Sequence, residues 1–138
     1  MTGEKIFFDT NILLYAHSEQ DYYKKQIALQ IILANRYIIS THVIDEFYNT
    51  LDRKLKLPLS EINEIIKVVL DYYPVVPVHD HTDRTSIYLH EKCRYPFFDC
   101  LMLASALEYN CKYIITEDMQ HKQIIENSLT IYNPFMIN

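Results

Sequence analysis

A short apolar run that ends on a carboxylate, just where a helical pattern begins, constrains this chain more than any other feature. The segment Phe7-Phe8-Asp9-Thr10-Asn11-Ile12-Leu13 has this layout, and Tyr113-Ile114-Ile115-Thr116-Glu117-Asp118 repeats it near the other end. Between the two, Asp99 stands near the start of an apolar helical stretch from Phe97 to Tyr109. Ligands of open α/β sheets bind at the carboxyl ends of the strands. These acids therefore predict a carboxylate site for a hard divalent cation.

Short apolar runs alternate with helical patterns along the whole chain. Strands are predicted at residues 5–8, 37–40, 113–115 and 129–131, with a brief extended piece at 75–76. Helices are predicted at 10–17, 22–34, 41–55, 60–70, 79–93 and 97–109, and Thr41 and Ser60 are expected to cap two of them. This alternation implies a central parallel sheet covered on both faces, which is a three-layer α/β/α sandwich.

Composition narrows the class of protein. With 138 residues, of which 49% are hydrophobic, the chain is expected to form a single globular domain over residues 1–138. A formal charge of -5 argues against a broad basic surface for nucleic acid, although a metal ion can offset an acidic pocket locally. The three cysteines lack metal-ligand spacing, and no apolar run reaches the length of a membrane span. We expect reduced thiols, no secretory signal, no membrane association and a cytoplasmic location.

Four motifs, taken in order, resemble the PIN-domain family and, within it, the small bacterial ribonuclease toxins called VapC. They are the Asp9 segment above, Ile39-Ser40-Thr41-His42-Val43-Ile44-Asp45-Glu46-Phe47, Phe98-Asp99-Cys100-Leu101-Met102-Leu103-Ala104-Ser105-Ala106, and Ile115-Thr116-Glu117-Asp118-Met119-Gln120-His121. Asn133-Pro134-Phe135 closes the similarity. Each motif alone is a weak signal, whereas four in this order and spacing are a strong one.

The resemblance implies an acidic catalytic and metal-binding site made of Asp9, Glu46, Asp99 and Asp118, with Asn11 and Thr116 in support. It implies a Mg²⁺- or Mn²⁺-dependent ribonuclease, the toxin of a type II toxin–antitoxin pair. RNA would be the substrate, an antitoxin protein the partner and a homodimer the expected assembly. Gathered carboxylates suit this chemistry, because two of them about 5 Å apart repel by roughly 3 kcal/mol at an effective dielectric constant near 20 unless a cation lies between them.

Each acid also has a plainer interpretation. Asp9 and Asp99 could serve as helix caps or first-turn acids. Glu46 lies opposite the apolar stripe of its helix and, without the resemblance, belongs to a solvated face. Glu117 competes with its neighbour Asp118 for the last position of the site, and Asp118 is preferred because Thr-x-Asp matches the family. Asp45 is expected to be a partly exposed structural acid.

Other polar and aromatic groups suggest weaker sites. His79-Asp80-His81 could bind a metal but favours a solvated turn, and His121 could contact RNA but favours an exposed helix start. Lys122 stands where the family often has glycine, which leaves the loop geometry open. The twelve tyrosines could stack on unpaired bases, although most are expected in the core or at an interface.

Competing functions divide into two classes. The first alternative is a PIN-fold module that binds RNA or protein and has no catalytic activity. A phosphotransfer protein on a similar sheet is disfavoured, because a dehalogenase-like phosphatase needs an acid where Asn11 stands. A response-regulator receiver needs adjacent acids after its first strand, and Asp9 is alone.

Overall fold

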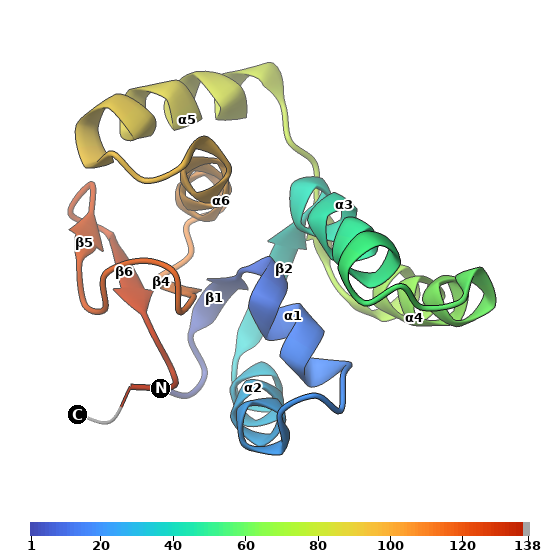
Figure 1. Ribbon diagram of the computed structural model, residues 1–138. Helices are drawn as coiled ribbons and strands as arrows, with labels where there is room; N and C mark the ends of the chain where they lie inside the picture. The colour runs from blue at the N-terminus through green and yellow to red at the C-terminus, as the bar shows by residue number, and fades with distance from the viewer. Residues whose placement is uncertain (137–138) are drawn as a thin grey trace.

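The computed structural model describes residues 1–136 and contains a six-stranded sheet at its centre (Figure 1). The strands are β1 (Lys5–Phe8), β2 (Arg36–Ser40), β3 (Val75–Val76), β4 (Tyr113–Ile115), β5 (Ile124–Ile125) and β6 (Leu129–Tyr132). Their order is β3-β2-β1-β4-β6-β5, and every neighbouring pair is parallel except β5 and β6. The predicted parallel sheet is confirmed, with one antiparallel edge strand added.

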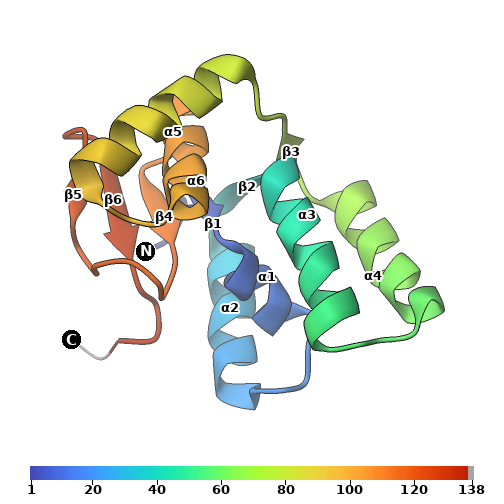
Figure 2. The ribbon, with the colours of Figure 1, turned by 45° about the horizontal axis from the view of Figure 1, so that its top comes forward.

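Helices pack on both faces of this sheet. They are α1 (Thr10–Ala16), α2 (Tyr22–Ala34), α3 (Thr41–Asn49), α4 (Leu59–Tyr72), α5 (Asp80–Cys93) and α6 (Phe97–Glu108). In Figure 1, α5 and α6 lie above the strands and α1 and α2 lie below them. Figure 2 shows α3 and α4 running side by side next to α1. This arrangement is the predicted α/β/α sandwich.

The strand order places a switch point beside β1. The chain runs from β1 outward through β2 and β3, and then returns to β4 on the other side of β1. Phe7 and Phe8 pair with Ile114 and Ile115 in register, and all four side chains are fully buried. The residues that follow these two strands therefore lie together at the carboxyl edge, where open α/β sheets bind their ligands.

Two predicted helix caps are wrong by one or two residues. The α3 cap is Ser40, whose hydroxyl accepts a 3.4 Å hydrogen bond from the amide of Val43, so Thr41 is the first helical residue. Pro58 precedes α4, and Ser60 lies in its first turn. Ser40 and Thr41 both have capping chemistry, and the backbone conformation decides between them; at α4 the helix begins after Pro58 without a side-chain cap.

Two local features have no counterpart in the predicted elements. The turn of helix after α3, η1 (Thr50–Lys54), is a π-helix, whereas the pattern predicted a continuous α-helix to about Leu55. The hairpin of β5 and β6 turns through Glu126 and Asn127, both with positive φ. A two-residue strand is too short to show periodicity, and left-handed asparagine is tolerated in such turns.

The three cysteines are free, as predicted; Cys93 is half-buried, and Cys100 and Cys111 are the two buried cysteines. Burial raises the pKa of each of these two buried thiols to about 11. Within residues 1–136, no helix is long and apolar enough to cross a membrane.

Candidate active site

A small pocket of about 100 Å³ opens at the carboxyl edge of the sheet. Predicted site residues come to it from four elements: Asp9 and Asn11 from the β1–α1 junction, Glu46 from α3, Asp99 from α6 and Asp118 from the loop after β4. Thr10, Thr50 and Met102 complete the lining, which includes no Lys or Arg side chain of the described chain. Four acids separated by up to 109 positions in sequence therefore share one small pocket without a basic neighbour in its wall.

Asp9 caps a helix and also lines the pocket. Its carboxylate caps α1 by accepting hydrogen bonds from the amides of Asn11 (2.9 Å) and Ile12 (3.4 Å). The hydroxyl of Thr116 donates a short hydrogen bond to the other carboxylate oxygen. Thr116 is therefore a buried support behind the pocket rather than part of its wall. Asp9 is only 1% exposed, and burial, with Asp118 nearby, raises its pKa to about 7.

The other acids disfavour one another's charge. Burial first, and then the charges of Asp118 and Glu46, raise the pKa of Asp99 to about 6. Burial is also the main reason that the pKa of Asp118 is raised, with Glu117 contributing next. A positive charge among these carboxyl groups would instead lower the pKa values of Asp99 and Asp118. The pocket is thus an electrostatically costly arrangement that a bound cation would relieve.

The structure separates Glu117 from Asp118. Glu117 turns away from the pocket: Lys24 Nζ lies 2.7 Å from its Oε2, and the Tyr15 hydroxyl donates a short hydrogen bond to its Oε1. Asp118 faces the pocket, where its Oδ2 accepts a 3.0 Å hydrogen bond from the amide of Asn11. Lys24 also sits over the Tyr15 ring, 4.9 Å from its centre. Glu117 is therefore already paired, and Asp118 is the carboxylate available to a ligand.

Glu46 points into the pocket because α3 begins directly at the carboxyl end of β2. His42 lies one turn earlier with its Nε2 2.7 Å from Glu46 Oε1, close enough for an ion pair but not aligned as a hydrogen bond. Thr10 donates a long, 3.5 Å hydrogen bond to the same oxygen. The hydroxyl of Thr50 donates to the backbone carbonyl of Glu46 at 3.0 Å, where the π-turn begins.

Sequence reasoning missed the polar residues around Glu46. Thr50 is four positions after Glu46, and such pairs share a helix face, so its place in the pocket wall could have been found. His42 has the same spacing on the other side. The π-turn left no visible signal, although such turns are frequent at functional sites.

The oxygen donors suit a hard divalent cation by type, but they do not form a finished cage. Within residues 1–136, no three His, Cys, Asp or Glu side chains make a ready metal-binding group. Both carboxylate oxygens of Asp9 already accept hydrogen bonds, from three protein donors in total. A cation would therefore draw the side chains together from the wall of the pocket rather than enter a rigid site.

The histidine motifs have structural partners instead. His79 caps α5 with Thr82, and its ring stacks on His81 at 5.1 Å between centres. His81 lies 2.7 Å from Glu108, which ties α5 to α6. His121 accepts a hydrogen bond from the amide of Asn133. Lys122 has a φ of 72°, which explains why glycine would suit that position.

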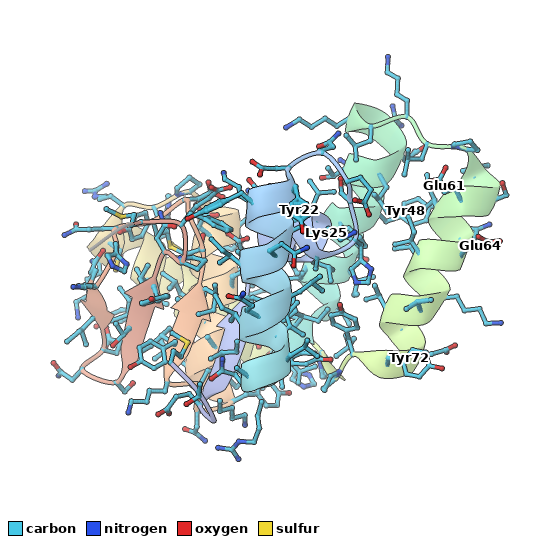
Figure 3. All side chains as sticks on the ribbon, turned by 90° about the horizontal axis from the view of Figure 1, so that it is seen from below. Tyr22, Lys25, Tyr48, Glu61, Glu64 and Tyr72 are labelled. Atoms are coloured by element: carbon cyan, nitrogen blue, oxygen red, sulfur yellow. The ribbon has the colours of Figure 1, made fainter. Side chains whose placement is uncertain are left out.

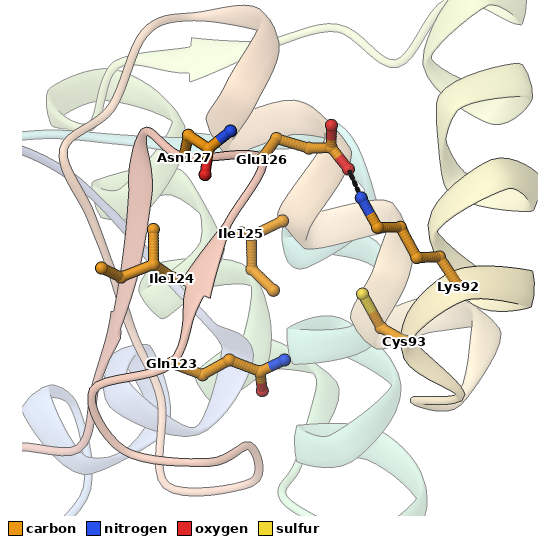
Figure 4. A pocket seen from close by; sticks show the side chains of 7 residues that line it. All are labelled: Lys92, Cys93, Gln123, Ile124, Ile125, Glu126 and Asn127. Atoms are coloured by element: carbon orange, nitrogen blue, oxygen red, sulfur yellow. Dashed lines mark hydrogen bonds and ion pairs between the residues drawn. The ribbon is translucent and has the colours of Figure 1, made fainter.

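Two other hollows lie away from the acids. One of about 310 Å³ is lined by Lys92 and Cys93 from α5 and by residues 123–127 of the β5 hairpin, and a 2.9 Å ion pair between Lys92 and Glu126 lies at its rim (Figure 4). Another, of about 290 Å³, lies between the α1–α2 loop, η1 and α4. On the side seen in Figure 3, the exposed side chains include Tyr22 and Tyr72.

Comparisons with known proteins agree with this architecture. The family model described as PIN domain matches residues 6–127. A toxin–antitoxin complex from Klebsiella pneumoniae is similar in structure, with a TM-score of 0.72, 19% identity, and coverage of 96% of this chain and 99% of that one. VapBC2 from Rickettsia felis, bound to a promoter DNA fragment, has a TM-score of 0.67, 17% identity, and coverage of 94% and 99%.

VapC20 from Mycobacterium tuberculosis, described as a toxin that cleaves the sarcin-ricin loop, is similar with a TM-score of 0.65. It is 17% identical, with coverage of 79% of this chain and 86% of that one. None of the curated proteins compared with the chain matches it. At these identities the solved structures support the fold, and the family model, which spans most of the sequence, decides the family. The chain belongs to the PIN domain family.

Proposed function

We propose that this protein is a Mg²⁺- or Mn²⁺-dependent endoribonuclease and the toxin of a type II toxin–antitoxin pair. One observation carries the proposal: four carboxylates from separate elements line a single pocket, and no Lys or Arg of residues 1–136 lines it with them. Membership of the PIN family and the fold shared with toxin–antitoxin proteins support it.

Asp9, Glu46, Asp99 and Asp118 would hold the cation, because carboxylate oxygens are the ligands that Mg²⁺ and Mn²⁺ prefer. When bound, such an ion activates water and neutralises the charge that develops on a phosphodiester. Thr116 and Asn11 would act on the acids themselves. Thr116 holds Asp9 in its capping orientation, and Asn11 holds Asp118 toward the pocket.

The chain's own residues also prepare the charge of the site. The raised pKa values of Asp9 and Asp99 mean that both carboxyls can carry protons near neutral pH in the absence of a cation. Opposite charge in the pocket would favour loss of those protons, so binding of the ion is expected to release protons and to strengthen with rising pH. Cleavage would leave a 5′-phosphate and a 3′-hydroxyl, and no residue need act as a covalent nucleophile.

The deciding experiment uses the purified protein, cellular RNA and sequencing of new 5′-monophosphate ends. Wild type with Mg²⁺ or Mn²⁺ should produce discrete ends that EDTA abolishes. Asp99→Asn should reduce the rate by roughly a hundredfold or more, because even residues that only orient metal ligands cost 10- to 100-fold. Asp45→Asn is the matched control, since Asp45 is an exposed acid on α3 outside the pocket lining.

Two results would contradict the proposal. Equal cleavage by wild type and Asp99→Asn would place the chemistry elsewhere. Calorimetric binding of Mn²⁺ by wild type without cleavage of any RNA would instead favour the inactive PIN-fold module.

The proposed partners follow from the same site. An acidic pocket of this size suits a Lys or Arg side chain presented by an antitoxin, which would occupy the place of the cation. We propose an antitoxin with such a basic segment, a homodimer in solution and a cytoplasmic location. Sedimentation velocity of the purified chain tests the dimer, and Mn²⁺ release on addition of the antitoxin tests the shared pocket.

A further inference from the structure

The side chain of Phe98 is an exception on its helix. The α6 residues from Cys100 to Ala106 are all buried, whereas the Phe98 ring in the first turn is 58% exposed. Phe97, its neighbour, is half-buried and stands edge-on to it at 6.2 Å between ring centres. The sequence therefore places a large aromatic surface in solvent, where a polar residue would serve the helix equally well.

The exposed ring is not loose. His42 from α3 packs against it, with 4.9 Å between ring centres and 40° between the planes. The His42 side chain is only 12% exposed, and its Nε2 is held 2.7 Å from Glu46. Phe98 thus rests on a ring that is itself anchored by an acid of the pocket. We call the rings of His42 and Phe98 the aromatic step.

Neither ring of the aromatic step lines the acidic pocket, but each adjoins one of the acids that do. Phe98 directly precedes Asp99, and His42 contacts Glu46; both of these acids line the pocket. A phosphodiester held at the pocket joins two nucleotides, and the base of each would lie within one nucleotide of the acids. The exposed ring therefore lies beside the pocket, linked to Glu46 through His42.

We propose that the aromatic step stacks one unpaired base next to the phosphodiester held at the acidic pocket, which makes Phe98 an RNA-binding residue of the site. This inference rests on the proposed function and adds a residue that contacts the substrate. Stacking on an aromatic ring accepts any base, because every base has a π-face. A base inside a helix has both faces covered by its neighbours, so only an unstacked base can use the ring.

The chain has no tryptophan, which allows a direct test. Phe98→Trp introduces a single indole at the step, and its emission should be quenched when an unmodified single-stranded RNA of about twelve nucleotides binds in Mg²⁺. A duplex of the same sequence should quench it far less. A separate variant, Tyr72→Trp, is the control. Tyr72 is 76% exposed at the end of α4, where β3 is about to begin, and so lies at the opposite end of the strands from the acids.

Removal of the ring gives the second readout. Phe98→Ala and Phe98→Leu should each weaken binding of the single-stranded RNA about tenfold, whereas Tyr72→Ala should leave it unchanged. Because Phe98 is exposed, these variants should melt at the wild-type temperature. The aliphatic variant separates stacking from simple apolar contact.

Several results would overturn the inference while leaving the proposed function intact. One such result is that wild type cleaves RNA and Phe98→Ala binds the single-stranded RNA as tightly as wild type does. Another is that Phe98→Leu binds this RNA with the wild-type affinity. A dimer that dissociates in Phe98→Ala, with RNA affinity unchanged, would assign the ring to a protein interface. Absence of any RNA binding or cleavage by wild type would instead refute the proposed function, and the stacking site with it.

Discussion

Asp9→Asn should make the protein more stable at pH 8, although Asp9 is proposed to hold the catalytic cation. Asp9 is fully buried, and its pKa rises from 3.8 to about 7 on folding. Between these two values the folded protein binds a proton that the unfolded chain has released, so this group makes stability fall as pH rises. Three pKa units correspond to about 4 kcal/mol, which is the upper limit of the destabilisation at pH 8.

Asparagine removes the charge while keeping the cap. Its side-chain oxygen can still accept from the amides of Asn11 and Ile12, and asparagine is as good a cap as aspartate. Its amide can donate to the oxygen of Thr116. The variant should therefore recover most of the 4 kcal/mol at pH 8, or about 10 °C in melting temperature for a domain of this size.

The assay is urea unfolding in EDTA at pH 8 and pH 5. The advantage of Asp9→Asn over wild type should shrink to roughly 2 kcal/mol at pH 5, because the wild-type carboxyl is then protonated in the folded state. Asp45→Asn, on an exposed acid, should show neither effect. A variant less stable than wild type at pH 8, or a difference that does not change with pH, would refute the reasoning. Added Mn²⁺ should raise the melting temperature of wild type and not that of Asp9→Asn.

Three further outcomes follow from the same contacts. Thr116→Val should cost about 2 to 3 kcal/mol in urea unfolding at pH 8, because it removes the donor to Asp9 and the acceptor of the Asp118 amide. Asp118→Asn should abolish Mn²⁺-dependent cleavage in single-turnover assays, while Glu117→Gln should keep it within about tenfold; the reverse order would exchange their roles. Ellman's reagent at pH 8 should modify Cys93 first, so Cys93→Ser should lack the fast phase, because the two buried cysteines are shielded and protonated.

Local sequence was sufficient for the outline of the fold. The apolar runs at β1 and β4 predicted buried parallel strands, and the helical patterns between them predicted the covering layers. The errors fell where local chemistry was ambiguous, as at Ser40 and Thr41, or where an element was too short for a period, as in β5. The PIN family itself was recognisable from the order of four motifs, and the family model confirms it.

Most acids of the candidate site could also be predicted from local sequence, but one could not. Asp9, Asp99 and the Glu117-Asp118 pair were visible because each acid follows or begins a strongly apolar element. Glu46 had no such signal, since on a lone helix it looks like any exposed acid. Its assignment to a catalytic site remains a prediction, but its side chain does line the same pocket as the others.

By itself, the sequence determined which segments become strands and helices and which acids stand at their ends, because apolar periodicity and capping act over a few residues. Only the tertiary structure decided which acid faces the pocket. Lys24 and Tyr15, about a hundred positions away from Glu117 in sequence, hold that carboxylate aside and leave Asp118 toward Asn11. His42 meets Phe98 through the same packing. Contacts of this kind depend on how α1, α2, α3 and α6 meet across the sheet, and no local pattern records them.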